Sequence, residues 1–202
     1  DTVAPVAPII SQGVDDVGTL TGTFGSGQVT DDTLPVLNGT SEANAVVRLF
    51  EHGIQIGQTT AGADGSWTIQ LTTALTTGPH TITATATDAA GNVSTPSGDF
   101  VINIDTTPPA VPVVTSVVDD VGATVNLTNG QVTNDALPTL NGTAEAGATV
   151  NIYDGTTLLG SVVATGGNWS FTPTTALGDG SHTLTVTATD AAGNVSAPTT
   201  GF

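Results

Sequence analysis

Acidic side chains are the residues in this sequence with the most obvious chemistry. The chain has 18 aspartates and glutamates and one basic residue, Arg48, so its formal net charge at pH 7 is −17. Carboxylates that lie close together repel one another unless they are protonated or share a cation. Calcium takes roughly 6–8 oxygen ligands from carboxylates, amide side chains and backbone carbonyls. The aspartate pairs Asp15–Asp16 and Asp31–Asp32 therefore indicate Ca2+ sites, and this hard oxygen set argues against a transition metal.

Other reactive side chains are scarce. The chain contains no cysteine, which excludes disulfides, zinc thiolate sites and cysteine nucleophiles. Its candidate bases are His52, His80 and His182, and we interpret them as structural because two of them begin equivalent predicted strands. No nucleophile elbow or phosphate-binding loop accompanies them. We therefore expect no enzyme activity and no small-molecule substrate.

Charge and hydropathy also exclude several partners. A net charge of −17 opposes binding to nucleic acid and to an anionic membrane surface. No apolar run approaches the roughly 18 residues that a membrane-spanning helix needs. We expect no nucleic-acid partner and no direct membrane insertion.

The sequence contains an internal repeat. The motif VDDVG at residues 14–18 recurs at 118–122, and TATDAAGNVS at residues 85–94 recurs unchanged at 187–196. A period of about 100 residues is the size of a self-sufficient domain, and it is too long for a solenoid repeat. We therefore divide the chain into two modules, residues 1–104 and 105–202.

The pattern within each copy predicts β-strands throughout. Residues 182–190, HTLTVTATD, alternate apolar and polar side chains, and turn signals recur along the chain. This pattern is typical of a β-sandwich, so we predict an all-β chain of two tandem immunoglobulin-like Greek-key domains arranged end to end. Trp67 and Trp169 are predicted to lie in the two cores. The strands predicted in the second copy are 112–118, 137–143, 148–154, 157–165, 168–173, 182–190 and 194–202.

Alternating strand directions gather the acidic residues at the two poles of each module. At one pole, carboxylates from the entering linker, from the loop after the second strand and from the loop near residue 88 are expected to converge. At the other pole lie the aspartate pairs of the first long loop. The predicted calcium ligands are Asp1, Asp15, Asp16, Asp31, Asp32, Glu42, Asp88, Asp105, Asp119, Asp120, Asn134, Asp135, Glu145 and Asp190.

One predicted site lies at the junction of the modules. It combines Asp105, Glu145 and Asp190, with Asn194 nearby. In the second copy Asn134 replaces an aspartate and offers one oxygen, so we expect a weaker site there. Aspartate and asparagine are also ordinary turn formers, and this interpretation stays open beside the calcium one.

Several motifs together resemble a known family. DTTPP, the DDVG loop, LPTLNGTAEAGATVNIYD and TATDAAGNVS resemble the bacterial Ig-like repeats of very large surface adhesins, the Bap-like and often RTX-type proteins. The resemblance implies calcium-binding extender modules whose partners are the neighbouring repeats of the same chain. It further implies a stiff extracellular stalk on the bacterial cell surface, exported by type I secretion. Such a stalk projects a terminal ligand-binding region for cell adhesion and biofilm formation.

An alternative function is a carbohydrate- or protein-binding Ig-like module. Binding surfaces are enriched in aromatic residues and arginine. This chain has one Tyr, one Arg and two Trp, and both tryptophans are predicted in cores. The spacer function is therefore favoured.

Overall fold

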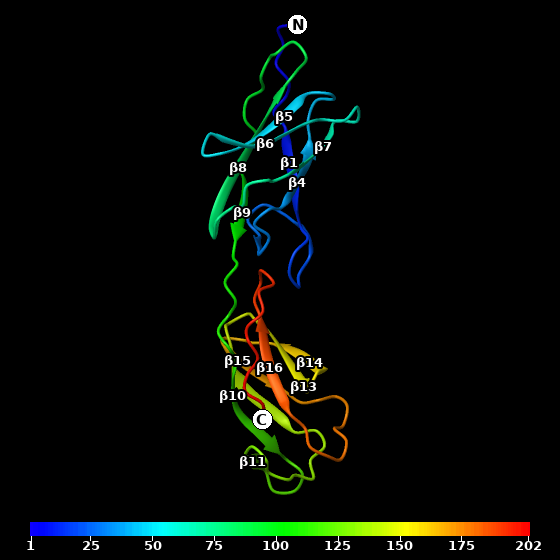
Figure 1. The fold of residues 1–202 in the computed structure, drawn as a ribbon, viewed down its shortest axis with the longest axis vertical. Helices are drawn as coiled ribbons and strands as arrows, with labels where there is room; N and C mark the ends of the chain where they lie inside the picture. Colours follow the sequence, from blue (N-terminus) through cyan, green and yellow to red (C-terminus); the bar gives the residue numbers. More distant parts are fainter. The chain divides into compact units, whose positions relative to one another are not determined.

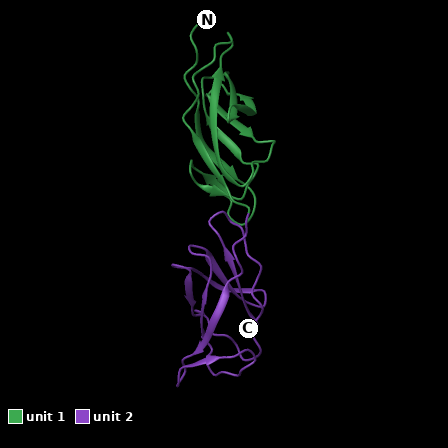
Figure 2. Ribbon diagram, turned by 90° about the vertical axis from the view of Figure 1, so that its left-hand side faces the viewer, with its two compact units in different colours: residues 1–106 green, residues 107–202 purple.

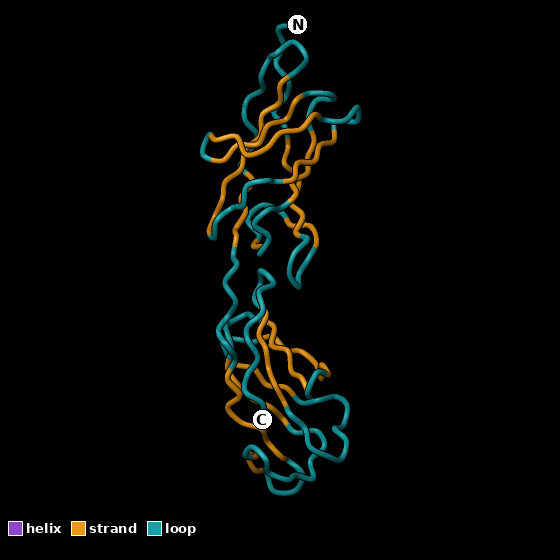
Figure 3. Tube along the Cα trace, viewed as in Figure 1, coloured by secondary structure: helices purple, strands orange, loops and turns teal.

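A computed structural model describes all of residues 1–202. Strands and turns make up the whole chain, which contains no helix (Figure 3). The chain divides into two compact units, residues 1–106 and 107–202, called here the first and second modules (Figure 2). The prediction of an all-β chain is confirmed.

The first module is a sandwich of two sheets (Figure 1). One sheet has the order β2-β1-β4-β7 and the other the order β3-β9-β8-β5-β6, so the chain crosses between the sheets after β2, β3, β4, β6 and β7. All neighbours pair antiparallel except β3 and β9, which pair parallel. The strands are β1 (Ile9–Asp15), β2 (Gly22–Phe24), β3 (Val29–Thr30), β4 (Val36–Thr40), β5 (Val46–Glu51), β6 (Ile54–Thr60), β7 (Ser66–Gln70), β8 (Gly78–Thr87) and β9 (Phe100–Ile104).

The second module repeats most of this arrangement. Its sheets have the orders β11-β10-β12-β15 and β14-β13-β16. The strands are β10 (Val113–Asp119), β11 (Val125–Leu127), β12 (Thr139–Thr143), β13 (Thr149–Asp154), β14 (Thr157–Val163), β15 (Asn168–Phe171) and β16 (Leu184–Thr189).

Alternation along the strands builds each core. In β8 the side chains of Ile82, Ala84 and Ala86 are fully buried, while the threonines between them are only partly buried. Each face of a strand therefore has one character, as a half-buried sheet requires. Trp67 and Trp169 belong to the two hydrophobic cores with 3% and 4% of their surface exposed, which confirms their predicted role.

A glycine lets each core tryptophan pack against its neighbouring strand. Gly39 in β4 faces Trp67 in β7. A Cβ atom at Gly39 would clash with the Trp67 ring and with the backbone oxygen of Ile9. In the second module Gly142 stands in the same relation to Trp169. The asparagine–glycine pair in the repeated LNG motif is therefore part of a strand and not of a turn.

The structure corrects some predicted strands. Residues 194–202 do not form a strand and contribute only the single bridge of Val195 to Thr189. Hydroxyl groups replace half of the ladder there, because Ser196 and Thr199 accept the amides of Ala188 and Val186 at 3.0 Å each, while their own amides still donate to the carbonyls of those residues. The short strands β2, β3 and β11 form within a segment that was expected to be only a loop.

The packing of glycine on tryptophan predicts a stability effect. Gly39→Ala should destabilise the first module by about 3 kcal/mol, because the added methyl group meets backbone as well as the indole ring. Urea unfolding measures this. Gly98→Ala is the control, since a Cβ there meets nothing within 4 Å, and it should leave stability nearly unchanged. Equal effects of the two substitutions would contradict the packing described.

Candidate functional site

Buried aspartates mark one end of the first module. Asp15 ends β1 and Asp32 follows β3, and their exposed fractions are 7% and 3%. Asp119 and Asp135 occupy the corresponding places in the second module, at 7% and 6%. Aspartate is almost never fully buried without a partner for its charge. All four also accept the amide two residues ahead, as turn-forming aspartates do, so what distinguishes them from surface turn residues is their burial.

A threonine holds each pair together. The Thr30 hydroxyl donates to Asp15 Oδ2, and its oxygen accepts the Asp32 amide at 3.1 Å. The other Asp15 oxygen accepts the Val17 amide at 3.0 Å. These bonds place the two carboxylates on the same small loop structure, which we call the Asp15–Asp32 site.

Asp32 carries the unusual electrostatics of this site. Its Oδ1 accepts the Leu34 amide at 2.7 Å, but its buried Oδ2 lacks a hydrogen bond of ordinary geometry, although the Asp16 amide lies near enough to lower the Asp32 pKa slightly. Burial raises the pKa of Asp32, and the negative charges of Asp15 and Asp16 raise it further. The site therefore presents a buried acceptor oxygen whose charge is poorly compensated.

A glycine makes room for another carboxylate nearby. Gly18 has a φ of 66°, in the left-handed region that favours glycine. A Cβ at this position would clash with Oδ2 of Asp31. The DDVG loop therefore brings Asp31 against the turn that follows Asp15.

The second module has the same frame with a better satisfied carboxylate. Thr133 donates to Asp119 Oδ2 at 2.6 Å, and the Asp135 amide donates to the Thr133 hydroxyl at 2.9 Å. Oδ2 of Asp135 accepts the Asp120 amide at 3.4 Å. Asn134 is exposed.

The opposite end of each module has a different arrangement. Asn92 donates its backbone and side-chain N–H groups to Asp88, at 2.8 Å each, and these bonds lower the pKa of Asp88. The same side chain donates to the Asp1 carbonyl at 3.4 Å, so the chain start lies beside this loop. Glu42 is exposed in the β4–β5 turn, where its carbonyl accepts the Ala45 amide.

The second module repeats this loop. Asn194 donates to Asp190 at 2.9 Å, and Asp190 is 9% exposed. Glu145 is exposed. The Asp105 amide donates to the Thr30 carbonyl at 2.9 Å, so Asp105 belongs to the first module while Asp190 and Glu145 belong to the second.

No three His, Asp or Glu side chains in the chain come close enough together to hold a metal ion by themselves. A calcium ion at the Asp15–Asp32 site would thus need backbone carbonyl and water oxygens to complete its shell. The ion pairs of the structure all join a histidine to a carboxylate, and none involves these aspartates. The calcium ligands stay a prediction, which the hard oxygen donors of the site fit.

Sequence reasoning missed two groups of functional residues. It did not single out Thr30 and Thr133, although the QVT segment before the acidic residues recurs in both copies. It also did not pair His80 with Glu51, which are joined across two strands. The usable signal was that both copies keep an acidic residue before the hairpin glycines and a histidine before the alternating strand.

Comparison with known proteins identifies the modules. Residues 9–106 and 110–202 each match the model of the bacterial Ig-like domain. The chain belongs to this family. No helix of this bacterial Ig-like tandem has the length and hydropathy to cross a membrane.

Similar proteins come from several contexts. Exoglucanase B of Cellulomonas fimi is 29% identical over 206 residues, which cover 99% of this chain but only 16% of that enzyme. The fibronectin(III)-like modules of Clostridium thermocellum CbhA superpose with a TM-score of 0.53 at 14% identity, covering 87% of each chain. A tetra-tandem repeat from the extending region of a large adhesion protein is 25% identical, with a TM-score of 0.34, over 90% of this chain and 51% of that one.

The poorly compensated oxygen of Asp32 predicts an effect of charge removal. A raised pKa means that the folded state disfavours the charged form, so this penalty is absent below the ordinary aspartate pKa and appears as pH rises through the raised value. Asp32→Asn should therefore raise the melting temperature of the calcium-free first module by a few degrees at pH 7. At pH 3 it should change little.

Asp64→Asn is the matched control. Hydrogen bonds from the Ser66 hydroxyl and amide lower the pKa of Asp64, so its charge stabilises the folded state at pH 7. Removing that charge should not raise the melting temperature. Calorimetry at both pH values distinguishes the two variants, and a lower melting temperature for Asp32→Asn at pH 7 would refute the electrostatic account.

Proposed function

We propose that this tandem is a calcium-stiffened spacer in a large extracellular protein of the bacterial cell surface, namely the extender region of an adhesin. The observation that carries the proposal is the duplicated pair of buried aspartates, with the poorly compensated Oδ2 of Asp32 in the first module. The family supports a structural role, because its modules are self-contained sandwiches that can be repeated along a chain.

Electrostatics explains why calcium would matter here. With 18 acidic residues and one arginine, the chain has almost no internal cation to offset the repulsion. Calcium held between Asp15 and Asp32, with Asp16 and Asp31 close by, would neutralise the site where burial is most costly. In the second module Asp119 and Asp135 would do the same.

Affinity would link this site to the outside of the cell. Extracellular calcium modules bind with dissociation constants of about 0.1–1 mM. Such a site is loaded in calcium-rich surroundings and empty inside a cell, which suits export of an unfolded chain by type I secretion. The partners in this role are the neighbouring Ig-like repeats of the same chain.

The adhesin assignment rests on the repeated motifs and their resemblance to Bap-like and RTX-type repeats. A stalk needs many equivalent modules, and the two copies keep the same acidic loops. Their function in adhesion and biofilm formation would be to carry a terminal binding region away from the cell. Catalysis forms no part of this role.

A second candidate is a spacer module within a secreted polysaccharide hydrolase. The likeness to Exoglucanase B over 99% of this chain favours it. A carbohydrate-binding function of the modules themselves is less favoured, because Trp67 and Trp169 lie in the cores and cannot stack on a sugar. Binding to cellulose films measures this directly.

The spacer proposal predicts a response to calcium. Addition of 10 mM calcium to the EDTA-treated protein should stabilise a module by about 1.4–2.7 kcal/mol for a dissociation constant of 0.1–1 mM. Calorimetry measures the gain, and small-angle scattering measures whether the maximum dimension becomes better defined. The first module should respond more strongly, since Asn134 is exposed in the second.

Matched variants assign the gain. Asp15→Asn and Asp32→Asn should each remove most of the calcium effect on the first module, while Asp64→Asn should keep it. An unchanged response in both loop variants would remove the Asp15–Asp32 site from the proposal. If neither melting nor scattering responds to calcium, while the tandem binds cellulose, the carbohydrate-binding function replaces the calcium-stiffened spacer.

A further inference from the structure

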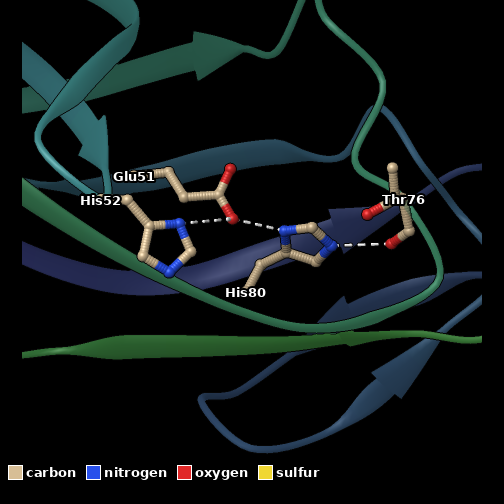
Figure 4. Close-up of polar contacts among 4 residues, drawn as sticks. All are labelled: Glu51, His52, Thr76 and His80. Carbon is tan, nitrogen blue, oxygen red and sulfur yellow. Dashed lines mark hydrogen bonds and ion pairs between the residues drawn. The ribbon is translucent and has the colours of Figure 1, made fainter.

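Both modules contain a histidine whose two ring nitrogens meet acceptors. In the first module His80 Nδ1 pairs with Glu51 Oε1, and its Nε2 lies 2.6 Å from the Thr76 carbonyl (Figure 4). In the second, His182 Nδ1 lies 2.7 Å from Asp154 Oδ2, and its Nε2 lies 2.8 Å from the Gly178 carbonyl.

Valence decides the protonation of these rings. A backbone carbonyl can only accept, so Nε2 must carry a proton in each case. An ionised carboxylate also only accepts, so Nδ1 must donate to it. Two donating nitrogens make the ring an imidazolium.

We propose that the second module carries a proton-dependent latch, in which the imidazolium of His182 ties the Asp154 carboxylate at the end of one strand to the Gly178 carbonyl in the loop before the next. Glu51 is the last residue of β5, and Asp154 is the last of β13. When the ring loses one proton, the carboxylate, as the stronger acceptor, keeps the Nδ1 proton, so Nε2 turns a lone pair toward the carbonyl and the resulting repulsion releases the loop.

The surroundings of His80 contain few other charges. In the first module the loop borders a hollow of about 370 Å³. Among the residues lining this hollow, only Glu51, His52 and His80 have ionisable side chains. His52 Nδ1 lies 3.9 Å from the same Glu51 oxygen, on the side of the carboxylate away from His80 (Figure 4).

The carboxylate in the second module has fewer neighbours than Glu51 has in the first. Gly155 stands at the hairpin position of His52, so Asp154 has a single histidine partner. Asp154 Oδ1 also accepts the Thr183 amide at 3.1 Å. Asp179 directly follows Gly178, whose carbonyl accepts the hydrogen bond from His182. It is the other carboxylate near this histidine in the sequence.

The direction of the pH effect follows from these contacts. The Gly178 carbonyl and the Asp154 carboxylate raise the pKa of His182 above its ordinary value. The latch therefore contributes its full stability below about pH 6.5 and loses it as pH rises through the raised pKa. Mild acid closes the latch, and alkaline conditions open it, independently of calcium.

Nuclear magnetic resonance on the full tandem tests the proposal. At pH 6 the ¹⁵N shifts should show protons on both ring nitrogens of His182. Between pH 6 and pH 9.5 the exchange protection factor of the Thr183 amide should fall about tenfold for each pH unit by which the folded pKa exceeds the unfolded one. A neutral His182 ring at pH 6, or a protection factor that does not change, overturns the latch.

Variants keep the test decisive. His182→Gln should abolish the pH dependence of Thr183 protection, while the first module, which keeps His80, serves as the folded reference in the same molecule. If the second module of that variant does not fold, Asp154→Asn replaces it. In Asp154→Asn the titration of His182 should move to lower pH, and an unmoved titration overturns the proposal.

Discussion

Burying a carboxylate costs free energy unless hydrogen-bond donors or a cation take up its charge. This chain buries five aspartates, two in the first module and three in the second, with almost no basic residues to offset them. In each module a threonine hydroxyl and backbone amides compensate part of this cost, as at Thr30 and Thr133. In the first module the compensation is incomplete, because one buried oxygen of Asp32 has no hydrogen-bond donor of ordinary geometry.

The sandwich explains why the aspartates are held so firmly. Asp15 ends a strand whose other residues pair with β2 and β4, and Thr30 is paired with β9 in the neighbouring sheet. The loop that contains the site is therefore anchored in both sheets of the module. Under the proposed function, a cation bound there would connect the two sheets.

Much of the fold could be predicted because it follows from alternation. The threonine–apolar pattern near residue 85 determines which side chains face the core. The two tryptophans are the largest apolar side chains, so their burial in the cores could be expected. The strand expected at residues 194–202 could not be judged this way, because Ser196 and Thr199 compete for the backbone amides that a strand would have used. Side-chain hydroxyls of this kind leave no periodic signal.

The site was predictable in residue type but not in geometry. Repeated aspartates indicated a cation, yet only the structure separates the buried Asp32 from the exposed Asn134 of the second module. The pairing of His80 with Glu51 depends on the register of β5 against β8, which no local pattern specifies. The family match and the acidic composition narrow the possible functions of the chain more than any arrangement of side chains in the structure does.

A crystal structure of the tandem grown in calcium tests the central claim most directly. We expect an ion at about 2.3–2.6 Å from the carboxylate oxygens of Asp15 and Asp32, which is the usual calcium–oxygen distance. Backbone carbonyls and waters should complete its shell. A water molecule at that position, although the crystal grew in calcium, would contradict the proposed calcium site.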